Sequence, residues 1–125
     1  MSIKIHFING DSELVEKHYL QKEYRNDIIF ECGGFYYEVY FFTEKALEYE
    51  ILTDGYFSMP GIIILTEVSN SKIILAIKEL FKVGYFKYFI GKEKIPINTR
   101  FIQQWYDNDM ATFNTKSMSS LDLEV

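Results

Sequence analysis

Two runs of aromatic and β-branched residues, joined by a glycine pair, occupy residues 28–42 of the chain. The pair, Gly33-Gly34, predicts a β-hairpin, because glycine readily adopts the positive φ angles that a tight primed turn requires. Along the second run, residues 35–42, alternate side chains fall on opposite faces of a strand, and neither face is consistently polar. We therefore expect this hairpin at the centre of a β-sheet, with a helix on one face and tyrosines lining the other.

Other apolar patterns predict four further strands. Residues 3–7 alternate between apolar and polar types, which is typical of a half-buried strand at or near a sheet edge. In residues 47–51 apolar residues alternate with glutamates, which predicts the third strand of a meander. Residues 61–68 are almost continuously apolar and predict an interior strand buried on both faces, and residues 85–90 predict a further aromatic strand.

Apolar residues at helical spacing predict the main amphipathic helix over residues 71–82, with lysines on the opposite side. Gly84 is positioned to end this helix, and the apolar side is expected to pack on the sheet. Weaker helical patterns begin near residue 11 and near residue 96. They predict one or two shorter helices at the margins of the sheet.

Together these elements predict an α+β fold. We expect a single domain whose antiparallel-dominated sheet has about five or six strands, with one main helix packed on a face. A chain of 125 residues is long enough for one core and too short for two, and we place the domain at residues 1–110. Residues 111–125 are polar and serine-rich, so we expect a loosely ordered tail there.

The composition of the chain bears on its binding surfaces and on its cellular compartment. Aromatic residues make up 18% of the chain, and tyrosine in particular suits recognition surfaces as well as cores. The single cysteine, Cys32, excludes an internal disulfide, which favours a cytoplasmic protein. The first residues do not resemble a secretory signal, and no apolar run is long enough to span a membrane.

Charge is unevenly distributed along the chain. The net charge is -5, and residues 1–67 alone carry twelve acidic against five basic residues, whereas residues 68–94 carry two against six. An acidic first half disfavours direct nucleic-acid binding, which requires clustered basic residues. The acidity would suit a basic protein partner, although mild acidity also serves simply to keep a protein soluble.

The chain contains no recognisable catalytic motif. A pair of nucleophile and base would have to use His6 or His18, the two histidines of the chain. Cys32 ends an apolar strand, where a cysteine is usually a small core residue. The Gly33-Gly34 pair joins two strands, whereas a phosphate-binding loop leads into a helix. We therefore predict a protein that is not an enzyme and has no cofactor and no metal site.

Acidic and aromatic residues are interleaved in two places, which is typical of a surface that binds a basic protein. Aromatic side chains supply contact energy there, while carboxylates steer the partner and select it. The predicted partner-binding residues are Glu48, Glu50, Asp54, Tyr56, Phe57, Trp105, Tyr106, Asp107 and Asp109.

Three segments carry a resemblance to a known class of proteins: FYYEVYFFT at residues 35–43, DGYFSMPGIIILTEV at residues 54–68, and SNSKIILAIKELFKVGYF at residues 69–86. Together they resemble the small immunity proteins of bacterial polymorphic toxin and contact-dependent growth inhibition systems. The resemblance covers roughly residues 28–90 and transfers no individual binding residue. It implies a cytoplasmic protein that binds one cognate toxin domain, commonly a basic nuclease, and occludes its active site or substrate surface.

Two other function classes remain open from the sequence. The first is a small-ligand-binding or enzymatic domain with a pocket between sheet and helix, lined by Tyr37, Tyr40 and Trp105. Such a domain should have a pocket of roughly a few hundred Å³ with convergent polar groups. The second is an assembly subunit that associates through an exposed strand edge. The sequence does not fix the oligomeric state.

Overall fold

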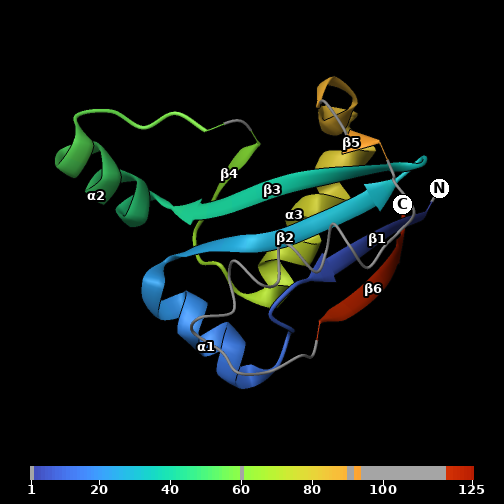
Figure 1. Ribbon diagram of the computed structural model, residues 1–125, viewed down its shortest axis with the longest axis horizontal. Helices are drawn as coiled ribbons and strands as arrows, with labels where there is room; N and C mark the ends of the chain where they lie inside the picture. The colour runs from blue at the N-terminus through green and yellow to red at the C-terminus, as the bar shows by residue number, and fades with distance from the viewer. Residues whose placement is uncertain (1, 60, 90–91, 94–117) are drawn as a thin grey trace.

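The computed structural model describes residues 2–59, 61–89, 92–93 and 118–125 (Figure 1). The elements follow one another as β1 (Ser2–Phe7), α1 (Glu13–Lys22), β2 (Tyr24–Cys32), β3 (Phe35–Thr43), α2 (Glu44–Asp54), β4 (Ile62–Leu65), α3 (Asn70–Lys82), the 3-10 helix η1 (Tyr85–Tyr88), β5 (Lys92–Glu93) and β6 (Ser119–Glu124). This confirms the predicted α+β fold.

The strands form one mixed sheet in the order β4-β3-β2-β1-β6, and β5 also pairs with β3. The predicted β2–β3 hairpin lies at its centre, and Gly33 and Gly34 adopt φ angles of 59° and 88° in the turn. Among the described strands, β3 and β4 pair in parallel and the remaining pairs are antiparallel. Antiparallel pairing therefore dominates, as predicted, with one parallel exception.

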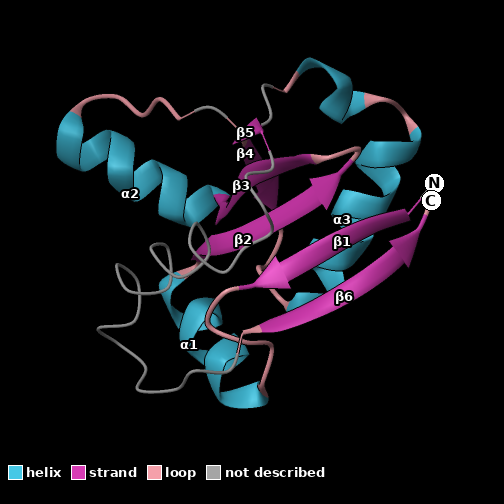
Figure 2. Cartoon of the chain, turned by 45° about the vertical axis from the view of Figure 1, so that its right-hand side comes forward, coloured by secondary structure: helices cyan, strands magenta, loops and turns pink. Residues whose placement is uncertain are grey.

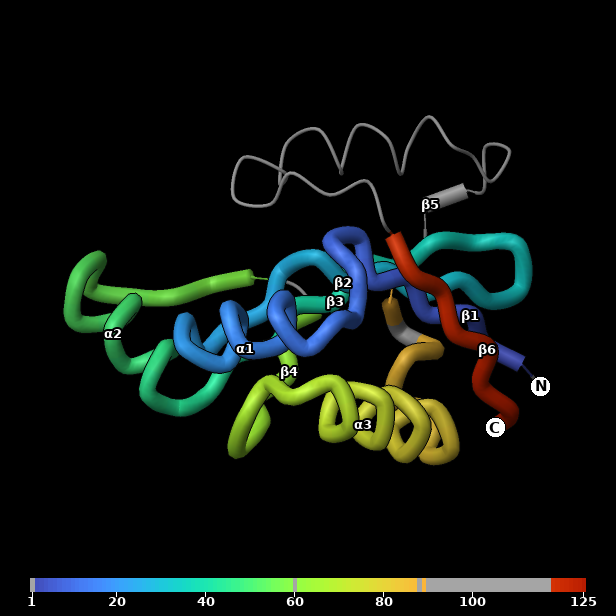
Figure 3. Tube along the Cα trace, turned by 90° about the horizontal axis from the view of Figure 1, so that it is seen from below, coloured from blue at the N-terminus to red at the C-terminus, as the bar shows by residue number. Residues whose placement is uncertain are grey.

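Helix α3 lies across one face of the sheet (Figure 3), which confirms the prediction for residues 71–82. Its residues Ile73 and Ile77 are fully buried and belong to the same apolar cluster as Ile5 of β1 and Phe30 of β2. Two buried residues of α1 join this cluster. The main core therefore lies between the sheet and the helices.

The segment predicted as a third meander strand, residues 47–51, is instead part of helix α2. The glutamates, leucines and alanine of α2 are good helix formers, and a helix can also hold Tyr49 and Ile51 two positions apart when both are exposed. The hydroxyl of Thr43 caps the start of α2, and Gly55 ends it in the left-handed conformation. Local capping therefore overrides the alternating pattern.

Two further strand predictions are wrong in part. Strand β4 covers Ile62–Leu65 at an edge of the described sheet and exposes Ile64, so it is not buried on both faces. Residues 85–88 form the 3-10 helix η1, because Gly84 ends α3 in the left-handed conformation and the following aromatic rings fold back together. Consecutive aromatic side chains can therefore be buried from a helical turn as well as from a strand.

The predicted loose tail is contradicted at residues 119–124. These residues form β6, which pairs with β1 along its whole length, and Figure 2 shows the two strands side by side. Leu123 packs against the main core, which explains why the short segment pairs so regularly. The predicted helix near residue 96, together with Trp105, Tyr106, Asp107 and Asp109, lies outside the described residues.

A buried polar network fastens α3 to the sheet. Arg25 of β2 donates hydrogen bonds to the Asp27 carboxylate at 2.8 Å, to the Asn70 side chain at 2.6 Å and to the Gly10 carbonyl at 2.7 Å. The Asp27 carboxylate also accepts a hydrogen bond from the Asn9 backbone N–H at 3.1 Å. One guanidinium thereby joins β2, the turn after β1 and the first residue of α3.

We expect Gly61→Ala to destabilise the protein by about 2 to 3 kcal/mol, because two costs combine at this position. Gly61 has a φ angle of 77°, and an added Cβ would lie 2.9 Å from the backbone oxygen of Glu38. Gly55→Ala is the matched control: its φ angle is 84°, but an added Cβ meets no atom within 4 Å. Urea denaturation should show the smaller loss for Gly55→Ala, and equal losses would contradict the proposed clash.

Candidate functional site

Helix α2 is well defined by its own sequence. The Thr43 hydroxyl accepts a hydrogen bond from the Ala46 backbone N–H at 3.2 Å, which satisfies one donor of the first turn. The Gly55 N–H donates to the Ile51 carbonyl at 2.7 Å at the other end. Glu44 in the first turn is also favourable for the helix dipole. Local interactions therefore define both ends of α2.

The position of α2 is unusual for the connection that it makes. It links β3 to the parallel strand β4, and such crossover helices normally cover a face of the sheet. Instead α2 projects beyond the end of β3, away from α3 (Figures 1 and 3). None of its eleven residues, all of them described, is buried. The helix is therefore presented to solvent.

Large apolar side chains lie on this exposed helix. Leu52 is 77% exposed, Tyr49 is 67% exposed, and Tyr56 in the following loop is 72% exposed. Helical geometry places Glu48, Tyr49 and Leu52 on neighbouring positions of the outward side, since each residue turns the helix by about 100°. Apolar contact area and negative charge are therefore combined on one surface, which we call the α2 surface: residues 44–54 and Tyr56.

Five of the predicted binding residues lie in this region, but not in the predicted arrangement. As members of a helix, Glu48 and Glu50 point about 200° apart, whereas strand positions would place them on one face. Glu48 and Asp54 are exposed, while Glu50 is half-buried. The α2 surface therefore presents Glu48 and Asp54 more fully than Glu50.

The two aromatic residues of the following loop have different surroundings. The Phe57 ring packs edge-on against Phe42 of β3, with 5.1 Å between ring centroids, so it anchors the loop to the sheet. Tyr56 is exposed beside it. The structure thus leaves Tyr56 available to a partner and gives Phe57 a structural contact. Trp105, Tyr106, Asp107 and Asp109 lie outside the described residues.

Tyr49 and Leu52 are not among the predicted binding residues, because a strand over residues 47–51 with its glutamates outward would turn Tyr49 inward. A helical pattern in residues 44–54 was nevertheless present. Thr43 is a favourable N-cap residue, Gly55 follows the last turn, and good helix formers lie between them. Recognising these two ends would have placed Tyr49 and Leu52 on neighbouring positions of one helix side.

A hydrogen-bonded chain crosses three strands on the face of the sheet opposite α3. The buried His6 ring lies 2.7 Å from the Ser120 hydroxyl through Nδ1 and 2.7 Å from the Glu31 carboxylate through Nε2. An ionised Glu31 carboxylate can only accept a hydrogen bond, so the tautomer with its proton on Nε2 fits both contacts, with the Ser120 hydroxyl donating to Nδ1. This is the order of groups found in serine hydrolases.

Catalysis by such a chain also requires a substrate cavity and donors for an oxyanion. One pocket formed by described residues lies on the other face of the sheet, since it contains Phe30 and Cys32, which flank Glu31 in β2. Within the described residues, the contacts of His6 with Ser120 and Glu31 join β6 and β2 on either side of β1.

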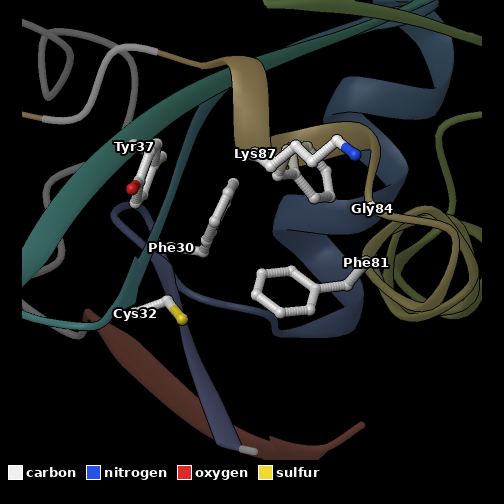
Figure 4. A pocket seen from close by; sticks show the side chains of 7 residues that line it. Phe30, Cys32, Tyr37, Phe81, Gly84 and Lys87 are labelled. Atoms are coloured by element: carbon white, nitrogen blue, oxygen red, sulfur yellow. The ribbon is translucent and has the colours of Figure 1, made fainter.

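The pocket lies between the sheet and the end of α3 (Figure 4) and has a volume of about 210 Å³. Its lining residues are Phe30, Cys32, Tyr37, Phe81, Gly84, Phe86 and Lys87. Of the residues predicted to line such a pocket, Tyr37 is present. Tyr40 does not line it, because it lies three positions along β3 and its hydroxyl donates to Glu38 at 2.9 Å. Trp105 lies outside the described residues.

Among the described residues, the lining of the pocket offers few polar groups, whereas the enzymatic alternative predicts several that converge. Its walls are mainly aromatic, and burial raises the pKa of the Cys32 thiol, with a smaller opposing effect from the positive N-terminus. A raised thiol pKa leaves little thiolate at neutral pH, which disfavours Cys32 as a nucleophile. The pocket is therefore suited to binding an apolar molecule.

Metal sites and membrane spans are two further features that the described part of the chain could contain. No group of three or more histidine, cysteine, aspartate or glutamate side chains is placed there to hold a metal ion. No helix within the same residues has the length and apolar character needed to cross a membrane. No family model, curated protein or solved structure matches the chain. The exposed residues of the protein are therefore the basis for proposing its function.

Proposed function

We propose that this protein is an immunity protein that binds and neutralises a cognate toxin domain, and that the α2 surface is its recognition element. The observation that carries the proposal is the exposure of α2, a capped helix that bears large apolar side chains and no buried residue. Exposed apolar patches rimmed by polar residues are typical of protein-binding sites. In this proposal the protein acts in the cytoplasm and has no catalytic role.

The chemistry of the α2 surface favours a partner held by a few strong contacts. Tyr49, Leu52 and Tyr56 offer apolar area that a complementary groove would remove from water. A preformed helix loses little conformational entropy on binding, so more of the contact energy contributes to affinity. An amphipathic helix that inserts into a groove is also a recurrent mode of protein recognition.

The charge of the same surface favours a basic partner. Residues 44–54 carry Glu44, Glu48, Glu50 and Asp54 against a single base, Lys45. That base lies 3.7 Å from the Glu23 carboxylate, which offsets part of its charge. A nuclease must present a basic surface to nucleic acid, and an acidic helix can occupy that surface. A basic nuclease domain is therefore the partner that we propose.

Co-expression with the toxin domain encoded by the adjacent reading frame tests the proposal. The protein should restore growth to cells that express this domain, and it should be recovered in a one-to-one complex with it. Restored growth without a complex would contradict neutralisation by binding. A purified complex that leaves nuclease activity unchanged would contradict occlusion of the active site or substrate surface.

We expect charge reversal on α2 to slow association with the toxin domain at low salt by about tenfold or more. The variant combines Glu48→Lys, Glu50→Lys and Asp54→Lys. Its matched control, Glu13→Lys, Glu67→Lys and Glu79→Lys, changes the net charge equally at exposed positions outside α2. Stopped-flow association rates at low and high salt should separate the two variants, and the difference should shrink as salt rises. Equal slowing by both variants would show that net charge alone matters.

A further inference from the structure

We propose that the pocket between β2, β3 and the end of α3 is a binding site for a small aromatic molecule of one or two rings. This site is separate from the α2 surface and does not depend on the proposed function. The pocket lies near the start of β3 and the end of α3, whereas α2 follows the other end of β3 (Figure 1). Occupation of the pocket and binding of a protein by α2 can therefore be tested independently.

The size of the pocket limits its ligand. An engineered cavity of about 150 Å³ with apolar walls binds benzene, and sites for larger ligands typically occupy about 300 to 1,000 Å³. The present pocket, at about 210 Å³, falls between these values. It is therefore large enough for one or two fused rings and too small for a nucleotide or a dinucleotide cofactor.

The walls of the pocket favour an aromatic ligand. The Phe30 ring stacks on Tyr37, with 4.9 Å between centroids and 9° between planes, and lies 4.7 Å from Phe86 at a tilt of 59°. Phe81 meets Phe30 edge-on at 6.4 Å. Phe30 is 0% exposed, so the half-buried Tyr37 and Phe81 offer the accessible aromatic surface, against which an aromatic molecule packs favourably. Phe30 and Phe86 are buried, so this part of the wall is preformed.

Figure 4 shows the Tyr37 hydroxyl, the Lys87 ammonium and the Cys32 sulfur at the ends of lining side chains. The Lys87 ammonium points away from Phe30 and Cys32, so its methylene stem is the part that contributes to the wall. The Cys32 sulfur lies on the opposite side, directed toward the space between Phe30 and Phe81. Because Cys32 is the single cysteine of the chain, its alkylation reports on this pocket alone.

The test measures alkylation of Cys32 by N-ethylmaleimide with and without 5-fluoroindole. At about five times the dissociation constant, mass action predicts about sixfold slower alkylation of the folded protein. We expect the dissociation constant to be about 1 mM or lower, from the size of the probe. Protein unfolded in urea is the control, because its alkylation rate should not change with 5-fluoroindole.

Two variants locate the binding site by fluorine NMR of 5-fluoroindole. Cys32→Met adds volume inside the pocket and should weaken binding about tenfold or more. Leu75→Met changes an exposed residue of α3 that does not line the pocket, and binding should be unaffected. Saturable protection of Cys32 in the unaltered protein, together with fluorine-detected binding that is lost in Cys32→Met, would support the proposal. Unchanged alkylation at saturating probe, or equal binding by both variants, would overturn it, whatever the outcome of the toxin experiments.

Discussion

Arg25→Met is expected to lower the free energy of unfolding by about 3 to 5 kcal/mol. The side chains of Arg25 and Asp27 are both 0% exposed and form an ion pair at 2.8 Å. The guanidinium also lies between two rings, 4.9 Å from the centroid of Phe7 and 4.7 Å from that of Tyr19. Methionine would fill much of this space, but it would leave the Asp27 carboxylate buried without its ionic partner.

Urea denaturation of three further variants separates the buried charge from other effects. Asp27→Asn in the Arg25→Met background should recover about 1 kcal/mol or more, because the unpaired charge is removed. Lys45→Met breaks the exposed ion pair with Glu23 and should cost about 0 to 1 kcal/mol. If Arg25→Met cost no more than Lys45→Met, the network would not have the structural role that we assign to it. The single variant Asp27→Asn completes the double-mutant cycle.

The second large effect is expected in binding. Replacing Tyr49, Leu52 and Tyr56 together with alanine should weaken binding of the toxin domain by at least about 100-fold, mostly through faster dissociation. The free energy of unfolding should change by less than about 0.5 kcal/mol for each substitution, because the three side chains are exposed in the free protein. Surface plasmon resonance and urea denaturation measure these two quantities separately.

Leu14→Ala is the control for this triple variant. Leu14 lies on α1, is 70% exposed and matches Leu52 in type and in exposure. Its replacement should leave binding unchanged within about twofold, since α1 is not part of the α2 surface. If Leu14→Ala weakened binding as much as Leu52→Ala, a different or much broader interface would be indicated. A loss of stability in the triple variant would mean that α2 is not independent of the core.

Strong local patterns explain which elements the sequence predicted correctly. Gly33-Gly34 between two β-branched and aromatic runs allows few alternatives to a hairpin, and the stripe containing Ile73 and Ile77 has a clear helical period. Residues 44–54 are different, because Leu47, Tyr49 and Ile51 fit a period of two while the capping residues fit a helix. Where the side chains of a segment are not buried, its apolar pattern does not distinguish strand from helix. Capping residues and helix propensity then determine the secondary structure.

Strand β6 illustrates a second limit of local sequence patterns. Its six residues are mostly polar, and they form a strand because β1 offers a pairing partner more than one hundred residues earlier. The contact between His6 and Ser120 joins the same two strands and is equally distant in sequence. Residues 121–125 alternate between apolar and polar types, but this short pattern does not identify β1 as the partner, since pairing depends on which strands are left at the edge of the sheet.

The exposure of α2 could not be predicted from its sequence for a related reason. A helix with Leu47, Ile51 and Leu52 has enough apolar residues to pack on a sheet, and crossover helices usually do so. Its actual position depends on where β3 ends and on the short length of β4. The acidic and aromatic composition of residues 48–57 predicted a binding surface, but the structure was needed to identify Tyr49 and Leu52.

The most direct test of the proposed recognition is amide hydrogen–deuterium exchange of the free protein and of its complex with the toxin domain. In the free protein, the exposed helix α2 should exchange faster than the buried strands, so its protection would be easily measured. We expect residues 44–56 to become strongly protected in the complex, while β6 changes little. Unchanged exchange in α2, with protection on another surface, would contradict recognition by the α2 surface.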